Sequence, residues 1–252
     1  WFAPEGVEPK DVWSFRRTNY FEHVGNECRR LREKVGVIDL TPFTKFEVTG
    51  PGAEGWLDSL VANKVPTKVG RIALCHALTQ RGGIRSEFTI TKLADHHYYV
   101  VSAGAAERYD SDFLRKKLPT DGSVTLRNIT GSRGVLVLAG PRARDVLAKL
   151  TDVPLDNASF PWLTGQVIEA GLATDVYALR VNFVGALGWE LHFPIEYAHG
   201  LFDAIFAAGA DYGIGMAGMR AMESLRMEKS YRMWGSDLTR DNTPLEGGLA
   251  RF

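Results

Sequence analysis

Short segments with alternating or continuous hydrophobic positions dominate the sequence. The stretch TKFEVTG (44–50) alternates apolar and polar residues as a strand does, and GVLVLA (134–139) is an apolar run typical of a buried strand. The stretch GAAERYDSDFLRKKL (104–118) instead repeats apolar residues at helical spacing and predicts an amphipathic helix. Strands are predicted over 44–50, 88–92, 98–103, 134–139, 176–183 and 188–194, and helices over 28–40, 50–63, 104–118, 140–150, 196–213 and 218–232. This mixture predicts an α+β fold.

One strand–helix unit occurs twice in the sequence. Gly50-Pro51, Ala53, Leu57 and Leu60 recur 90 residues later as Gly140-Pro141, Ala143, Leu147 and Leu150. In each copy a strand leads into Gly-Pro, and proline suits the first turn of the helix that follows. The repeat predicts internally duplicated antiparallel sheets with packed helices. Within residues 1–252 we expect two subdomains, roughly 1–50 with 140–252, and 51–139.

Composition and charge narrow the range of partners. Lys and Arg together number 30, as do Asp and Glu, so the formal net charge is zero and no basic surface for nucleic acid is indicated. No run of about 18 apolar residues predicts a membrane span. Cys28 and Cys75 lie far apart without metal-type spacing and are interpreted as ordinary thiols in a reducing compartment. These features favour a small-molecule partner, and the start at Trp1 suggests a piece of a longer protein.

Two carboxylates are candidates for chemistry. Glu87 follows a Gly-Gly turn in TQRGGIRSEFTITK and shares one strand face with Thr89 and Thr91. Glu190 lies in NFVGALGWELHFP, an apolar and aromatic stretch, and shares its strand face with His192. Alternating polar residues also mark the solvent side of an antiparallel sheet, so the pattern alone leaves both interpretations open.

Several other site types are not indicated. No G-x-G-x-x-G follows a strand, and no P-loop, nucleophile elbow or C-x-x-C motif occurs. The adjacent His96 and His97 would point to opposite faces of an extended strand, so a solvated turn is favoured over a metal site.

Many ordered motifs together resemble one family. They include REKVGVIDLTPFTKFEVTGPGAEGWLDSL, RGGIRSEFTIT, YYVVSAG, GVLVLAGPRARDVL, NFVGALGWELHFP, SLRMEKSYRMWGSDL and TPLEGGL. The sequence resembles the folate-binding aminomethyltransferases, typified by the T-protein of the glycine cleavage system. It resembles still more closely the C-terminal tetrahydrofolate domain of dimethylglycine and sarcosine dehydrogenases, through FPWLT, GWELH and EKSYRMWGSDL. The resemblance implies the aminomethyltransferase folate-binding fold, with the family's C-terminal β-barrel missing from these residues.

The resemblance assigns roles to both carboxylates. Glu87 matches the catalytic carboxylate near the reacting nitrogens of tetrahydrofolate, and Glu190 matches the glutamate that binds the pterin. A carboxylate can accept the ring N–H and the amino group of a reduced pterin as a fork. Trp189 or Phe183 would form an aromatic wall that excludes water, and Tyr99 matches a folate-contacting tyrosine.

The implied reaction captures a one-carbon unit. In these dehydrogenases, flavin-driven oxidation of an N-methyl amine gives an iminium, which water would hydrolyse to formaldehyde. A folate nitrogen attacks its carbon instead, and 5,10-methylenetetrahydrofolate forms. The implied cofactor is tetrahydrofolate, and the implied small-molecule partner is a methylated amine. FAD would belong to a missing upstream oxidase domain or to a partner chain, and the location would be the bacterial cytoplasm or the mitochondrial matrix.

Departures from the family pattern keep other functions open. The family more often has aspartate at the position of Glu87. Ser86 stands where T-proteins have an acidic residue, and Met222 stands where they have an arginine. Phe183 stands where tyrosine is common, and Ala186 stands where glutamate is common. A stand-alone aminomethyltransferase and a folate-dependent S- or O-demethylase are the nearest alternatives. A non-catalytic folate-binding module is the alternative from another class, although the K-G-C-Y-x-G-Q-E segment of such relatives is absent.

Overall fold

The computed structural model describes residues 1–250 of the chain, which divide into two compact units. The first unit comprises Trp1–Thr41, Gly134–Trp162 and Ile168–Tyr231, and the second comprises Pro42–Arg133, Leu163–Val167 and the segment from Arg232 onward. Each unit is built around its own sheet and its own hydrophobic core.

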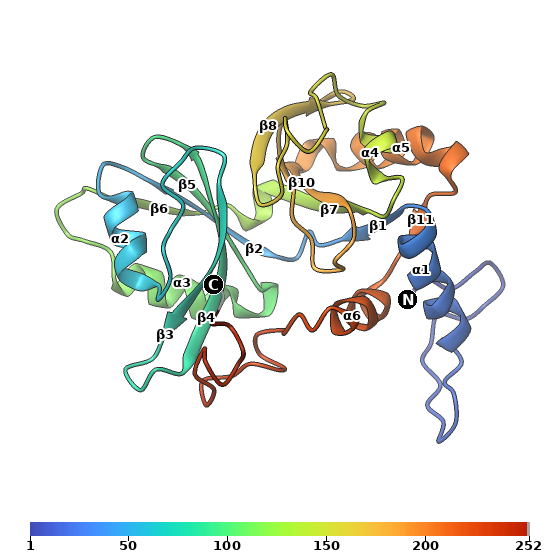
Figure 1. Ribbon diagram of the computed structural model, residues 1–252, viewed down its shortest axis with the longest axis horizontal. Coiled ribbons are helices and arrows are strands. Elements are labelled where there is room, and N and C mark those ends of the chain that lie inside the picture. Colours follow the sequence, from blue (N-terminus) through green and yellow to red (C-terminus); the bar gives the residue numbers. More distant parts are fainter. Residues whose placement is uncertain (251–252) are drawn as a thin grey trace. The chain divides into compact units, whose positions relative to one another are not determined.

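The first unit contains a six-stranded sheet with helices on both faces (Figure 1). The strand order is β11-β1-β7-β10-β9-β8. The strands are β1 (Gly36–Asp39), β7 (Arg133–Ala139), β8 (Gly165–Ala170), β9 (Ala173–Leu179), β10 (Gly188–Pro194) and β11 (Gly215–Met216). One face packs on α4 (Ala143–Leu147) and α5 (Ala198–Gly209), and the other face packs on α1 (Phe21–Glu33) and α6 (Met219–Glu228). The β1–β11 pair is parallel, which differs from the expectation of purely antiparallel sheets.

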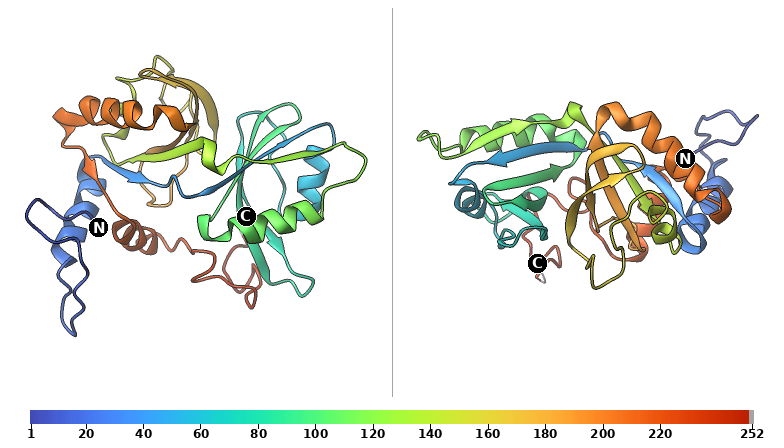
Figure 2. Two further views of the ribbon diagram at one scale, coloured as in Figure 1. Left: turned by 180° about the vertical axis from the view of Figure 1, so that it is seen from behind. Right: turned by 90° about the horizontal axis from the view of Figure 1, so that it is seen from above.

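The second unit contains a five-stranded antiparallel sheet of order β3-β4-β5-β2-β6 (Figure 2). Its strands are β2 (Thr44–Thr49), β3 (Ile72–Leu78), β4 (Ile84–Ala94), β5 (His97–Ser102) and β6 (Thr125–Asn128). The helices α2 (Ala53–Leu60) and α3 (Glu107–Lys116) pack on one face, where Phe46, Phe88 and Tyr98 form the centre of the core. The short 3-10 helices of the chain are η1 (Gly104–Ala106), η2 (Thr130–Ser132), η3 (Ile195–Tyr197) and η4 (Ala210–Tyr212).

The segment from Arg232 onward and β2 both belong to the second unit, whereas the sequence pattern suggested a place in the first. The position of β2 is fixed because it pairs with β5 and β6. In the C-terminal segment, Leu238 and Leu249 pack on Ile84, and the Trp234 indole N–H donates to the Ile84 carbonyl at 3.2 Å. The long sequence separation of these contacts hides them from a local pattern.

One expected helix begins and ends earlier than its hydrophobic spacing suggests. Residues 28–40 predict a helix that includes Leu31, Val35 and Ile38, but α1 ends at Glu33 and β1 begins at Gly36. All three apolar side chains are buried, so a strand that follows a helix at once can imitate a continued helical period.

The duplicated strand–helix unit appears once in each unit of the structure. β2 leads into α2 through Gly50, and β7 leads into α4 through Gly140. The two glycines have φ of +115° and +125°, and their carbonyls accept from Ala53 and Ala143, each at 3.0 Å. A Cβ at Gly140 would lie 2.5 Å from the Lys34 carbonyl oxygen. Both turns therefore need glycine for the same two reasons, left-handed backbone and close approach of another chain segment.

Gly140→Ala is expected to lower the free energy of unfolding by about 1–3 kcal/mol, because alanine is strained at this φ and its methyl group meets the Lys34 carbonyl. The matched control is Gly55→Ala in α2, where an added Cβ meets no atom within 4 Å. That change should stabilise the helix by up to about 1 kcal/mol. Urea unfolding followed by circular dichroism measures both effects, and equal stability of Gly140→Ala and wild type would contradict the role of this turn.

Candidate functional site

Glu190 is a buried carboxylate on β10 of the first unit. Its Cα pairs with that of Leu179 on β9. Because side chains alternate along a strand, Glu190 and His192 share the face opposite to that of Trp189 and Leu191. Glu190 Oε2 lies 3.2 Å from His192 Nε2, and both side chains are almost entirely buried. His192 is the only hydrogen-bond partner of this carboxylate within residues 1–250. A buried charge normally has several polar partners, so Glu190 can accept further donors.

The loop that precedes β10 is ordered by one asparagine. The Asn182 side chain donates to the Ala186 carbonyl at 2.9 Å, and its oxygen accepts from the backbone N–H groups of Val184 and Gly185. These three bonds close residues 182–186 into a compact turn. The loop next to Glu190 is therefore held in one shape by its own side chain.

Phe183 projects from this loop onto residues from the end of α6. Its ring stacks on Tyr231 with ring centroids 6.1 Å apart and an interplanar angle of 22°. The Arg226 guanidinium lies 5.9 Å from the Phe183 ring and donates to the Tyr231 carbonyl at 2.7 Å. Arg226 also pairs with Glu223 and is 1% exposed. This cation thus holds Phe183 and Tyr231 together.

Arg226 was not among the residues predicted from the sequence. The sequence contained a signal, because the resemblance implies an arginine of the T-proteins at the position of Met222, and Arg226 follows one helical turn later. Met222 is buried in α6 as well. The helix therefore carries a buried guanidinium, although at a different position from the one that the resemblance implies.

Trp189 lies away from the Glu190 carboxylate. Its indole is fully buried in the core beneath α4 and α5, edge-on to Phe160 with ring centroids 5.9 Å apart. Trp189 therefore does not form the expected aromatic wall beside Glu190, because consecutive residues of a strand point to opposite faces. Trp189 supports β10 from behind.

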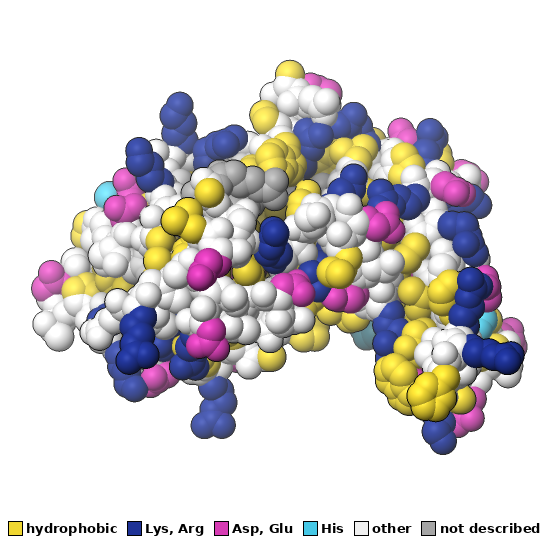
Figure 3. Space-filling view, turned by 60° about the horizontal axis from the view of Figure 1, so that its bottom comes forward, with side chains coloured by type: hydrophobic (Ala, Val, Ile, Leu, Met, Phe, Trp, Pro, Cys, Tyr) yellow, Lys and Arg dark blue, Asp and Glu magenta, His cyan; other side chains and the backbone are white. Residues whose placement is uncertain are grey.

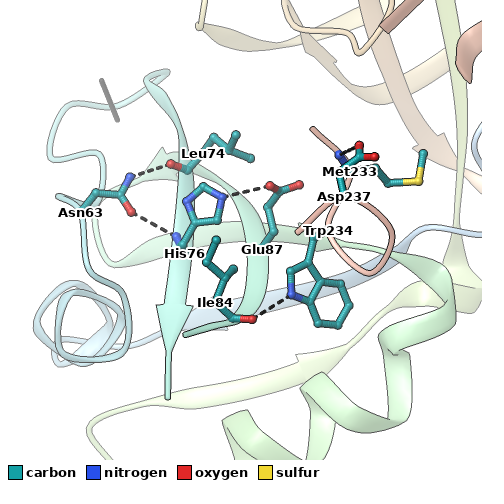
Figure 4. Close-up of polar contacts among 8 residues, drawn as sticks. All are labelled: Asn63, Leu74, His76, Ile84, Glu87, Met233, Trp234 and Asp237. Atoms are coloured by element: carbon teal, nitrogen blue, oxygen red, sulfur yellow. Dashed lines mark hydrogen bonds and ion pairs between the residues drawn. The ribbon is translucent and has the colours of Figure 1, made fainter. Parts of the chain in front are cut away.

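Glu87 is a partly exposed carboxylate on β4 of the second unit. It is the direct cross-strand partner of His76 on β3, and its Oε2 lies 3.0 Å from His76 Nε2 (Figure 4). The His76 side chain is 3% exposed, whereas that of Glu87 is 23% exposed. His76 is the only hydrogen-bond partner of Glu87 among the described residues. The geometry gives an accessible carboxylate whose orientation is set by a buried histidine.

Asn63 fixes the strand that carries His76. Its side-chain oxygen accepts from the His76 backbone N–H at 3.1 Å, and its amide donates to the Leu74 carbonyl at 2.6 Å (Figure 4). Asn63 thus replaces a neighbouring strand at this point of β3. Neither His76 nor Asn63 was among the residues predicted from the sequence. The Gly82-Gly83 hairpin could have indicated His76, because a hairpin sets which residues lie opposite each other.

Tyr99 and Glu87 lie on the same face of the same sheet. Thr91 of β4 pairs with Tyr99 of β5, and Glu87 and Thr91 share one face of their strand. Tyr99 is fully buried. The Thr91 hydroxyl is buried and has no hydrogen-bond partner among the described residues. The part of this face around Thr91 and Tyr99 is therefore covered, and it contains a polar atom that can accept or donate.

Ser86 points to the opposite face, where it is hydrogen-bonded to a buried carboxylate. Its hydroxyl donates to Asp110 Oδ1 on α3 at 2.7 Å. Asp110 is fully buried, and burial raises the pKa of its carboxyl group. An acidic residue at position 86 would bring a second carboxylate against Asp110 in a fully buried site. Serine instead supplies the donor that Asp110 requires.

No group of three or more His, Cys, Asp and Glu side chains in residues 1–250 could hold a metal ion. His96 has a φ of 58° in an exposed turn, and His97 lies 3.1 Å from Glu47. Of the helices in this described part, none combines the length and hydrophobicity needed to cross a bilayer.

Comparison with known proteins agrees with this architecture. Residues 1–252 match the family described as the GCVT N-terminal domain. Mitochondrial dimethylglycine dehydrogenase of Mus musculus is 39% identical, over 100% of this chain and 29% of that protein. The mitochondrial pyruvate dehydrogenase phosphatase regulatory subunit of Mus musculus is 34% identical, over 94% of this chain and 27% of that protein. Glycine cleavage system aminomethyltransferase T from Bartonella henselae has a crystal structure with a TM-score of 0.80 at 25% identity, covering 90% of this chain and 60% of that chain.

These matches confirm the family and the α+β fold expected from the sequence. The chain spans less than a third of the length of the two mouse proteins, so the matches concern one region of each. The chain belongs to the GCVT N-terminal domain family.

Proposed function

We propose that this chain is the tetrahydrofolate-binding one-carbon transfer region of a dimethylglycine or sarcosine dehydrogenase-like N-demethylase. The observation that carries the proposal is Glu190, a buried carboxylate with His192 as its only hydrogen-bond partner within residues 1–250. The 39% identity to a dimethylglycine dehydrogenase supports the donor class, a methylated amine. When bound, tetrahydrofolate supplies the nitrogen nucleophile that accepts the one-carbon unit, and 5,10-methylenetetrahydrofolate is the product.

Glu190 fits the polar edge of a reduced pterin. That edge presents a ring N–H and an amino group, and one carboxylate can accept from both. His192 holds the carboxylate at one oxygen, which leaves acceptor capacity for the ligand. Phe183, fixed on Tyr231, is proposed as an apolar contact of the folate, and Tyr99 as a further contact. Trp189 supports the strand and does not touch the ligand in this proposal.

Glu87 is proposed as the acid–base residue. Its carboxylate is accessible to solvent, while its hydrogen bond to His76 restricts its orientation. A carboxylate held in this way can accept a proton at Oε1 or Oε2 and can stabilise nearby positive charge. The oxidation that precedes this step is assigned to FAD in another domain of a longer protein or in a partner chain.

The proposal is tested with the flavin-containing protein isolated from its natural source. Dimethylglycine is oxidised with and without tetrahydrofolate, and free formaldehyde is measured. We expect tetrahydrofolate to suppress formaldehyde and to yield the methylene product in equal amount, because water and folate compete for the same carbon. Unchanged formaldehyde release at saturating folate would contradict the proposal.

His76 should influence this reaction through Glu87. We expect His76→Leu to slow formation of the methylene product by up to about 100-fold, because the carboxylate loses the contact that orients it. His76→Gln keeps a donor and should restore most of the rate. His97→Leu is the matched control, since His97 makes a similar 3.1 Å contact with Glu47 on the same sheet. Single-turnover kinetics measures the rates, and an equal loss in the Leu and Gln variants would argue against orientation.

One second candidate function has specific support. The relative named as a regulatory subunit of pyruvate dehydrogenase phosphatase is 34% identical over 94% of this chain, which favours a non-catalytic folate-binding module as the alternative. Folate binding without any methylene product would favour that alternative. A stand-alone aminomethyltransferase or an S- or O-demethylase would instead form folate products without flavin-dependent oxidation of an N-methyl amine.

A further inference from the structure

Large apolar side chains are exposed together at the N-terminal end of the first unit. Val12 is 55% exposed, Trp13 is 72% exposed, Phe21 is 45% exposed and Phe15 is fully exposed. We call these four residues the N-terminal aromatic surface. Figure 3 shows hydrophobic side chains gathered over this part of the molecule, at the lower right. Soluble proteins rarely expose such a group unless it binds something.

The loop that presents these side chains is ordered by its own hydrogen bonds. Asn19 accepts from the Val12 backbone N–H at 2.9 Å, and its amide donates to the Lys10 carbonyl at 2.8 Å. Asp11 accepts from the Trp1 indole N–H at 2.8 Å and pairs with Arg220 on α6. The loop is thus closed at its base and anchored to a helix, which keeps the apolar side chains pointing outward.

Stacking gives the aromatic surface a defined shape. Trp13 meets Tyr20 edge-on, with ring centroids 6.2 Å apart, and the Arg220 guanidinium lies 4.1 Å from the Tyr20 ring. The Arg17 guanidinium lies 4.1 Å from the Phe21 ring. Trp13 and Phe15 are therefore displayed from a preorganised support, the arrangement that gives anchor residues of protein interfaces their effect.

A groove between α1 and α6 continues from Phe21 and has a charged border. Phe21, Val24 and Leu225 contribute apolar lining, while the border carries both signs of charge, from Arg29, Arg32, Glu33 and Glu228. Arg32 pairs with Glu228 across this border. An apolar centre with a polar rim is the usual composition of a protein–protein interface. Its complement is a folded surface with apolar side chains at the centre and polar side chains at the edge.

We propose that the N-terminal aromatic surface docks the flavin-dependent amine oxidase domain that supplies the one-carbon unit. The proposal rests on the proposed function, because an oxidised amine released into bulk water would be hydrolysed before it reached folate. It also rests on length, since this chain matches only 29% of the mouse dimethylglycine dehydrogenase and most of that protein lies outside the match. A large folded neighbour can cover Trp13 and Phe15 at once.

Trp162 provides a matched control within the same unit. It is 65% exposed, close to the value for Trp13, but it lies outside the N-terminal aromatic surface. A single exposed apolar side chain is normal and requires no partner. The two tryptophans should therefore behave alike in the absence of a neighbour, and differently when the aromatic surface is covered.

The test is hydroxyl-radical footprinting of the native flavin-containing protein, read residue by residue by mass spectrometry. We expect Trp13 to be modified about tenfold more slowly than Trp162, as for a residue at the centre of an interface. Equal rates for the two residues would overturn the proposal. Isolation of the native protein without any flavin would overturn it as well.

Further arms exclude other occupants and separate this proposal from the proposed function. Protection that disappears on dilution to a smaller particle, with the flavin retained, would indicate a second copy of the chain and overturn the proposal. Protection that appears only with lipid vesicles would overturn it in favour of a membrane. The double change Trp13→Ser and Phe15→Ser should expose Phe21 to modification, whereas Trp162→Ser should not. If folate has no effect on formaldehyde release but Trp13 is protected, the proposed function fails while the docking surface stands.

Discussion

Glu190→Ala is expected to weaken tetrahydrofolate binding by about 100-fold or more, measured by calorimetry under anaerobic conditions. The reason is the loss of two hydrogen bonds between a buried carboxylate and the pterin, each worth about 1.5–3 kcal/mol when one partner is charged. Glu190→Gln preserves the shape of the side chain and removes the charge, so its affinity should lie between those of wild type and Glu190→Ala. An intermediate affinity of Glu190→Gln would show that the charge of Glu190 contributes to folate binding in addition to its packing.

The control for this experiment is Glu169→Ala. Glu169 is exposed on β8 of the same sheet, so its removal changes net charge equally without removing a buried carboxylate. Affinity should be unchanged in this variant. If Glu190→Ala and Glu169→Ala bind folate equally well, and both are folded by circular dichroism, the pterin-binding role of Glu190 is excluded.

Glu87→Gln is expected to bind tetrahydrofolate normally and to form the methylene product about 100- to 10,000-fold more slowly, the range associated with loss of an acid–base group. Glutamine has almost the same shape, and its side-chain oxygen can still accept from His76. It cannot take up a proton at neutral pH. Rapid-quench analysis of a single turnover separates this chemical step from flavin reduction, which should proceed at the wild-type rate.

Glu47→Gln serves as the comparison for Glu87→Gln. Glu47 lies on β2 of the same sheet and is also in contact with a histidine, His97. Product formation should be unaffected there, since no role in the reaction is proposed for Glu47. A wild-type rate in Glu87→Gln would remove Glu87 from the reaction and leave the folate-binding proposal to be judged on Glu190 alone.

Alternation along strands was sufficient to predict much of the site. The shared face of Glu87 and Thr91, and that of Glu190 and His192, follow from the pleat and agree with the structure. The same rule, applied to Trp189, would have placed its indole behind Glu190 rather than beside it. The repeated Gly-Pro turns could likewise be predicted from local sequence, because a turn position with positive φ favours glycine.

Features that depend on contacts between distant segments could not be predicted from the sequence pattern. Contact between His76 and Glu87 requires the register of β3 against β4, and Asn63 acts on that strand from a loop. The role of Arg226 depends on the contact between Tyr231 and Phe183 beside it, which the sequence does not show. The end of α1 at Glu33 could not be predicted, because the next strand buries apolar residues at a spacing that resembles that of a helix.

The hydrogen bond between Ser86 and Asp110 restricts the evolutionary paths open to this chain. The resemblance to T-proteins implies an acidic residue at position 86. One substitution could not introduce that residue here, because two enclosed anions would repel each other. Asp110 would first have to become uncharged, for example as asparagine, whose side-chain oxygen can still accept from Ser86. The two positions are thus expected to change as a pair, and an engineer who transplants a T-protein motif into this scaffold would need to move both.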